Sequence, residues 1–213
     1  QPMSRHVTIW PGDEPMRTPW AAVIGSPVKR SLSPEVFRRF SGSLGRRVRY
    51  KAVEIPAGGL LPAFRRARKL AWLGLNVTAS HKAAVAGLVD RLDPWAAAVG
   101  AVNVVHFRDG FAMWYNTDVE SFLAPLKASG VGLKGRTALV FGAGGAAAAV
   151  CEALKRSLMA ELYVAGRTPA KAAALAERFG GLAVEADEAR LKALAETADL
   201  LVNATSAGEA GLL

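Results

Sequence analysis

The sequence predicts an α/β protein with two domains. Strand-length apolar segments alternate with helical segments, at a spacing that produces right-handed parallel β-α-β units. A glycine-rich stretch at residues 130–135 separates two such series. In the second series a strand runs into a glycine turn at 142–147 and an alanine-rich helix, which is typical of a Rossmann-type domain.

The first series is defined by alternation and turn signals. Residues 21–25 form an apolar run typical of a buried strand, and Ser33-Pro34 suits a helix start, with the serine as cap. Residues 48–55 alternate like a half-buried strand, and Asp109-Gly110 favours a hairpin turn. The other predicted elements are a helix at 60–70, a strand at 74–77, a helix from Asp93-Pro94, hairpin strands at 103–107 and 111–115, and a helix at 119–129.

The second series predicts four strands and three helices. Because a full doubly wound sheet has about six strands, we expect this one to be truncated at its C-terminal end. The predicted elements are strands at 137–141, 161–165, near Val184 and at 200–203, with helices at 145–158, 169–179 and 187–196. We place an extended leader at 1–19, a first domain at 20–118, a linking helix and loop at 119–135, and the partial second domain at 136–213.

Composition argues against several classes of protein. The net charge of +9 comes from scattered arginines without interleaved aromatics or zinc-finger spacing, so we expect no nucleic acid partner. No apolar run approaches the roughly 20 residues that span a bilayer. Cys151 has no disulfide partner and no signal peptide is present, which favours a reducing cytoplasm. His6, His81 and His106 form no ligand pattern with that cysteine, so we expect no metal.

The glycine turn has the context of a dinucleotide-binding motif. Gly142 permits a tight turn, Gly144 lets a pyrophosphate approach the backbone, and Ala147 allows close helix–strand packing. The helix start supplies oriented donors for phosphate. The alternative is a glycine-rich turn without a ligand. The candidate cofactor residues here are Gly142, Ala143, Gly144, Gly145 and Ala146.

The next strand ends in residues that favour NADP over NAD. An NAD-selective domain usually has a carboxylate at this point, whereas this chain has Gly166 and then Arg167. Thr168 is adjacent and Lys171 follows, and an arginine here can pair with a 2′-phosphate. The alternative is a solvent-exposed arginine after a strand.

Polar residues at the ends of three apolar stretches suggest a proton-transfer site. They are Asn-Val-Thr at 76–78 with Lys82, Ala-Val-Asn at 101–103, and Asn-Thr-Asp at 116–118. A lysine near a buried cleft can have its pKa lowered by desolvation, which fits it for proton transfer. Asp118 can orient that ammonium and bind a substrate hydroxyl. The alternatives are a surface lysine and a helix cap, yet the groups together indicate a dehydrogenase for a small polyhydroxylated acid.

Two hydroxyls follow the first strand, in Ser31-Leu32-Ser33, beside the start of a helix. That combination suits a substrate carboxylate. The alternative, that Ser33 caps its helix, is compatible with binding.

In this order the motifs resemble the shikimate dehydrogenase family, from about Ala21 to Gly208. The resemblance implies a substrate domain, a NADP domain, and hydride transfer between NADPH and the 3-keto group of 3-dehydroshikimate. It implies Lys82 as proton donor and acceptor, with Asp118 beside it. It assigns substrate binding to Ser31, Ser33, Asn76, Thr78 and Asn103, and adds Asn203, Ala204 and Thr205 to the cofactor residues.

The chain also departs from the family pattern. The family usually has proline at Ser80 and asparagine at Gly166, and later segments that close the cofactor domain have no counterpart before Leu213. Quinate/shikimate dehydrogenase and a non-catalytic ligand-binding homologue therefore remain alternatives. We expect a monomer or a homodimer.

Overall fold

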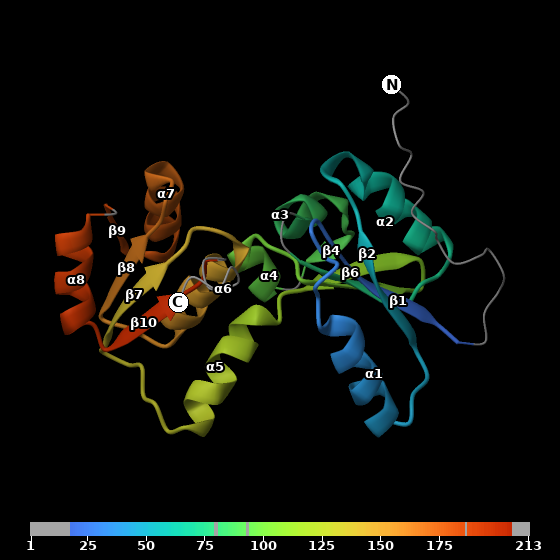
Figure 1. Cartoon of the computed structure of the whole chain (residues 1–213), viewed down its shortest axis with the longest axis horizontal. Coiled ribbons are helices and arrows are strands. Elements are labelled where there is room, and N and C mark those ends of the chain that lie inside the picture. The colour runs from blue at the N-terminus through green and yellow to red at the C-terminus, as the bar shows by residue number, and fades with distance from the viewer. Residues whose placement is uncertain (1–17, 79–80, 93, 186, 206–213) are drawn as a thin grey trace. The chain divides into compact units, whose positions relative to one another are not determined.

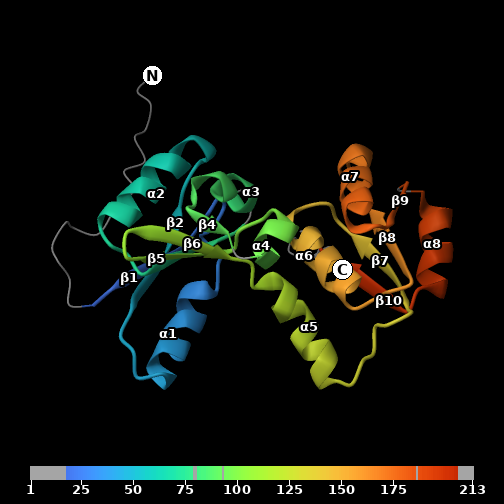
Figure 2. The same cartoon turned by 180° about the vertical axis from the view of Figure 1, so that it is seen from behind.

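The computed structural model describes residues 18–78, 81–92, 94–185 and 187–205 (Figures 1 and 2). The predicted leader lies outside the described residues, apart from its last two positions. Two compact units are present. The first contains the described parts of residues 1–93 and 102–115, and the second those of 94–101 and 116–213. The predicted α/β class is confirmed, and each unit has its own sheet.

The first unit has a six-stranded mixed sheet in the order β2-β1-β3-β5-β6-β4. Strand β1 is parallel to both its neighbours, whereas β5 is antiparallel to β3 and β6. Asp109 and Gly110 have φ angles of 51° and 79°, which fits the predicted hairpin turn. The strands are β1 (Trp20–Gly25), β2 (Arg49–Glu54), β3 (Gly74–Val77), β4 (Arg91–Leu92), β5 (Val104–Arg108) and β6 (Phe111–Tyr115).

Helices cover both faces of this sheet (Figure 1). Helix α1 (Ser33–Ser43) lies on one face, where Phe37 stacks on Tyr50 of β2 with ring centroids 4.2 Å apart. Helix α2 (Leu60–Lys69) lies on the other, and buries an apolar stripe that includes Phe64. Shorter helical segments are η1 (Ala57–Gly59), α3 (Lys82–Val85) and η3 (Ala86–Leu88).

Helix α1 differs from α2, the other long helix described in this unit, because it buries no residue. Four apolar side chains in the helix and at its two cap positions form a ridge at four-residue spacing, and each is 59–76% exposed. The prediction that Ser33 caps α1 is wrong, because the helix begins at Ser33 and Leu32 occupies the cap position. The ridge consists of Leu32, Val36, Phe40 and Leu44.

The second unit has a parallel four-stranded sheet in the order β10-β7-β8-β9. Its strands are β7 (Thr137–Phe141), β8 (Glu161–Ala165), β9 (Leu182–Val184) and β10 (Leu200–Asn203). Its helices are α4 (Pro94–Val99), α5 (Asp118–Ala128), α6 (Gly145–Arg156), α7 (Pro169–Phe179) and α8 (Glu188–Thr197).

Alternate residues of β7 and β8 point to two apolar layers, as the period of a strand requires. Val140 and Val164 pack with α6 and α7, whereas Leu139 and Ala165 face α8. Helices α4 and α5 contribute to the layer of α6 and α7 through residues such as Val119. The structure thus groups residues 94–101 and 116–135 with the second unit, whereas the sequence suggested a first domain to 118 and a link to 135.

Candidate active site

Three segments of the first unit meet at the carboxyl ends of β1 and β3. The Thr78 amide donates to the Ile24 carbonyl at 2.9 Å, and the Val77 amide donates to the Asn103 carbonyl at 2.8 Å. The Val102 amide donates to the Lys82 carbonyl, also at 2.8 Å. These bonds bring the backbone of three predicted site residues, Thr78, Lys82 and Asn103, to one region of the unit.

Gly25 makes this convergence possible. A Cβ atom at Gly25 would lie 2.6 Å from Cγ2 of Thr78 and 3.2 Å from the Thr78 carbonyl oxygen. Only glycine therefore lets the end of β1 approach Thr78 this closely. Thr78 and Lys82 are half-buried and Asn103 is buried, so the polar groups lie partly out of water, where a hydrogen bond discriminates better between ligands. Ser80 lies outside the described residues.

The two serines and Asn76 are connected through a residue that the sequence reasoning missed, Tyr50. The Ser31 hydroxyl donates to Ser33 Oγ at 3.0 Å, and the Tyr50 hydroxyl donates to Asn76 Oδ1 at 2.7 Å. Burial raises the pKa of Tyr50, and a hydrogen bond from Ser33 opposes that rise. Tyr50 thus stays a neutral donor, which fixes the Asn76 amide with its NH2 group available to a ligand.

His81, which precedes Lys82, is a second residue whose role the sequence did not indicate. It is 2% exposed, and its Nε2 lies 2.6 Å from the carbonyl oxygen of Ile55. Because a carbonyl can only accept, Nε2 carries the proton. The imidazole thus anchors the start of α3, on which Lys82 lies, to the end of β2. The only hint in the sequence was a histidine next to an otherwise apolar run.

Asp118 begins α5 in the second unit, and a buried amide holds this helix start. Nδ2 of Asn116 donates to the Ala101 carbonyl at 2.8 Å, and Oδ1 of Asn116 accepts from the Asp118 amide at 2.9 Å. Asn116 is 6% exposed. The cap position belongs to Thr117, which makes no side-chain capping bond. The Asp118 carboxylate is therefore on the first turn of a helix with a fixed start.

The glycine turn and the 203–205 segment lie side by side, because β7 and β10 are neighbours. Gly142 has a φ of 122°, which residues other than glycine rarely adopt, and a Cβ there would lie 2.8 Å from the Ala204 carbonyl oxygen. Both the backbone angle and the lack of space therefore require glycine at this position. The Ala204 amide donates to the Phe141 carbonyl at 2.8 Å. Asn203 Oδ1 accepts from the amide and the hydroxyl of Thr205, at 3.0 and 2.6 Å.

The described residues leave the space around Gly144 unoccupied, in contrast to the space around Gly142. A Cβ at Gly144 would meet no described atom within 4 Å, so the backbone of the turn is accessible to a ligand. Gly145 and Ala146 begin α6, and Ala143 precedes Gly144 in the turn. A fully buried Ala147 lets α6 pack against β7, as predicted. An exposed glycine turn before a helix start fits a phosphate group.

The candidate 2′-phosphate residues follow β8 in the same unit. Arg167 and Thr168 are exposed, and Thr168 occupies the cap position of α7. Lys171 is exposed on the first turn of that helix. A Cβ at Gly166 would lie 3.5 Å from Cβ of Ala143, an ordinary contact, so the backbone there does not demand glycine. Two cations beside a helix start make this end of β8 suitable for an anion.

Other kinds of site find no support in the described part of the chain. Its His, Cys, Asp and Glu side chains form no group of three or more suited to a metal ion. Of its helices, none combines the length and apolar character needed to traverse a bilayer.

Comparisons with known proteins cover both units of the chain. Residues 23–105 match the family model of the shikimate dehydrogenase substrate binding domain, and residues 124–212 match the model of shikimate / quinate 5-dehydrogenase. Shikimate dehydrogenase (NADP(+)) of Rubrobacter xylanophilus is 45% identical over 195 residues, which are 90% of this chain and 69% of that protein.

Two solved structures are also similar. Shikimate dehydrogenase from Aquifex aeolicus aligns with a TM-score of 0.84 and 35% identity, over 91% of this chain and 71% of that one. The Thermus thermophilus enzyme, solved with NADP(H) and shikimate, aligns with a TM-score of 0.78 and 42% identity, over 89% and 69% of the two chains. The chain thus spans about two thirds of the length of these relatives. The predicted resemblance is confirmed: this chain belongs to the shikimate dehydrogenase family.

Proposed function

We propose that this protein catalyses the NADP-dependent, reversible interconversion of shikimate and 3-dehydroshikimate. The observation that carries the proposal is the 45% identity to a shikimate dehydrogenase (NADP(+)), together with polar groups at the strand ends where a hydroxylated acid can be held. The reaction belongs to biosynthesis of aromatic amino acids in the cytoplasm, and we propose a monomer or a homodimer.

The first unit binds the substrate in this proposal. Ser31 and Ser33 hold the carboxylate, and Asn76, Thr78 and Asn103 hold ring hydroxyls. Lys82 transfers the proton. When shikimate is oxidised, the hydroxyl O–H bond breaks and its proton goes to the neutral Lys82 amine as the C–O bond becomes C=O. In the reverse direction the ammonium returns that proton to the forming alkoxide. Asp118 contributes a hydrogen bond to a substrate hydroxyl.

The second unit binds NADP in this proposal. When bound, the cofactor would accept or donate the hydride. The accessible backbone of Gly144 and the start of α6, with Ala143, Gly145 and Ala146, suit the pyrophosphate. Arg167, with Thr168 and Lys171, suits the 2′-phosphate. The segment 203–205 lies against Gly142 and forms the neighbouring wall.

Initial rates on purified protein test this function. We expect NADPH formation from shikimate and NADP+, with lower kcat/KM when quinate replaces shikimate or NAD+ replaces NADP+. A higher kcat/KM for quinate would assign the quinate activity instead. Shikimate binding in calorimetry without turnover of either acid would favour the non-catalytic homologue.

A further inference from the structure

In the described part of the chain, the excess of positive over negative charge lies in one of the two units. The described residues of the first unit contain 15 lysines and arginines against four carboxylates, whereas those of the second contain ten of each. A small folded unit with this excess attracts anionic partners strongly at moderate ionic strength. The proposed substrate and cofactor account for few of these cations, because Lys82 is the one basic residue assigned to substrate in this unit.

Much of this charge lies on β2 and α2, which carry six cations and one carboxylate. Arg49 and Lys51 point to the α2 side of the sheet, since their charged ends lie 5.6 and 4.9 Å from the ring centroid of Trp20. Trp20 in turn stacks on Trp72, which follows α2. Glu54, three residues after Lys51 on the same strand, points to the opposite face of the sheet.

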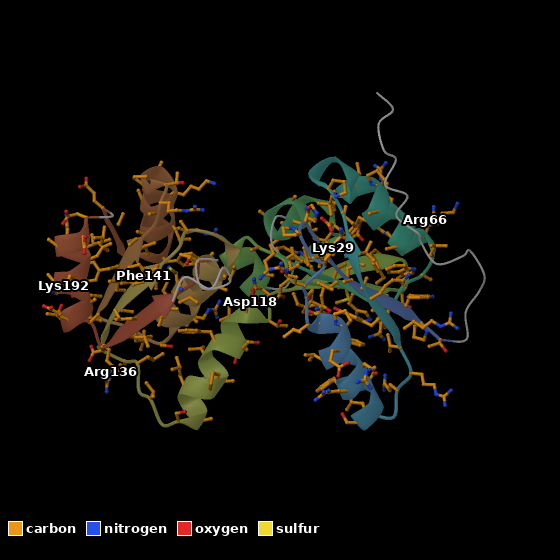
Figure 3. The ribbon with its side chains drawn as sticks, viewed as in Figure 1. Lys29, Arg66, Asp118, Arg136, Phe141 and Lys192 are labelled. Atoms are coloured by element: carbon orange, nitrogen blue, oxygen red, sulfur yellow. The ribbon has the colours of Figure 1, made fainter. Side chains whose placement is uncertain are left out.

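Helix α2 extends the same surface. Arg65, Arg66 and Lys69 are exposed on its outer side, and Figure 3 shows Arg66 pointing away from the sheet. Arg68 is half-buried, pairs with Asp90 at 3.0 Å and donates to the Gly110 carbonyl, so it ties the helix to the hairpin. We define the basic face as Arg49, Lys51, Arg65, Arg66 and Lys69.

The edge of the sheet borders this face. Among the described strands β2 pairs only with β1, so one side of its backbone presents amide and carbonyl groups outward. Such an edge hydrogen-bonds to another polypeptide strand, which a nucleic acid or a lipid cannot supply. Arg49 and Lys51 discourage a second copy of this chain, because like charges would be opposed. An acidic strand relieves that repulsion.

The basic face lacks the features that a nucleic acid or an anionic membrane surface would need for binding. The ring of Trp20 is engaged by two cations and by Trp72, so it is not free to stack on bases. Leu61 is the one large apolar side chain exposed on α2, too little for insertion into a membrane surface. We propose that the β2 edge and the basic face dock an acidic, extended segment of a partner protein.

Fluorescence anisotropy with a labelled peptide of alternating glutamate and threonine tests the proposal without reference to enzymatic activity. We expect saturable binding that weakens as salt rises from about 50 to 300 mM. The same peptide with glutamine for glutamate should not bind. N-methylation at alternate residues should also abolish binding, because it blocks pairing with a strand edge. Equal binding of the N-methylated peptide would overturn strand addition.

A matched pair of variants tests the location. Arg65→Gln/Arg66→Gln removes an adjacent arginine pair from the basic face, and should weaken binding about fivefold. Arg38→Gln/Arg39→Gln removes an equivalent exposed pair from α1 on the other face, and should leave binding unchanged. Circular dichroism and thermal unfolding verify that both variants fold. Equal losses in the two variants would show a general charge effect and overturn the proposal. So would tighter binding of single-stranded DNA or of phosphatidylglycerol vesicles than of the acidic peptide.

Discussion

Replacing Tyr50 by phenylalanine removes the hydroxyl that links Asn76 to Ser33. The change keeps the ring that stacks on Phe37 and removes the hydroxyl, which donates to Asn76 Oδ1 at 2.7 Å and accepts from Ser33. A neutral hydrogen bond contributes about 0.5–1.5 kcal/mol. If that free energy serves to orient Asn76 for the substrate, KM for shikimate should rise about 2- to 12-fold. The proton-transfer step does not involve this hydroxyl, so kcat should change little.

Steady-state kinetics with shikimate varied at saturating NADP+ measure this effect. Because the pKa of Tyr50 is raised by burial, its hydroxyl stays protonated through the neutral and mildly alkaline range, and the KM ratio should not depend on pH there. Tyr163→Phe is the control, since the Tyr163 hydroxyl donates only to an exposed Glu161 at 3.2 Å. A Tyr50→Phe variant with unchanged KM, or with a loss confined to kcat, would refute the positioning role.

Three further changes have defined outcomes. Lys82→Ala should lower kcat about 10²- to 10⁴-fold while shikimate still binds in calorimetry, and near-normal turnover would remove Lys82 from proton transfer. Arg167→Ala should weaken NADP+ binding tenfold or more, from about 1.5–3 kcal/mol for a charge-assisted bond, and leave NAD+ binding unchanged. Burial raises the pKa of Cys151 to about 12, so its contribution to stability is present below the pKa of the unfolded thiol and is lost as pH rises towards 12. In urea unfolding, wild type should therefore lose more free energy of unfolding between pH 8 and 11 than Cys151→Ala, and parallel losses would contradict this.

Much of the fold could be predicted because the local signals agree with the packing. The hairpin at Asp109-Gly110, the strand before Gly142 and the helix after it each have a distinct apolar period and a turn residue that suits its backbone. The short strand β4 was not predicted, because two residues carry no measurable period.

Contacts between distant parts of the sequence could not be predicted. Tyr50 and Asn76 are 26 residues apart, and only the parallel pairing of β1 with both β2 and β3 brings their strands close. Likewise, periodicity shows that α5 has an apolar face but not which core that face joins, so Val119 gave no indication that it packs with the second unit. The serine at the start of α1 was assigned as a cap from residue type alone, whereas the helix includes it.

The absence of buried residues in α1 has a consequence for local unfolding. An isolated helix of 11 residues is marginal in water, and α1 is held by the Phe37–Tyr50 stack and by exposed ion pairs from Glu35 to Arg38 and Arg39. Its amides should therefore exchange with deuterium faster than those of α2, through openings that leave the sheet intact. Because Ser33 is its first residue, each opening also displaces one of the two hydroxyls that we propose bind the substrate carboxylate. Shikimate should therefore slow exchange in α1 more than in α2. Because binding requires the helix to be formed, the free energy needed to close α1 makes the binding free energy of the acid less favourable.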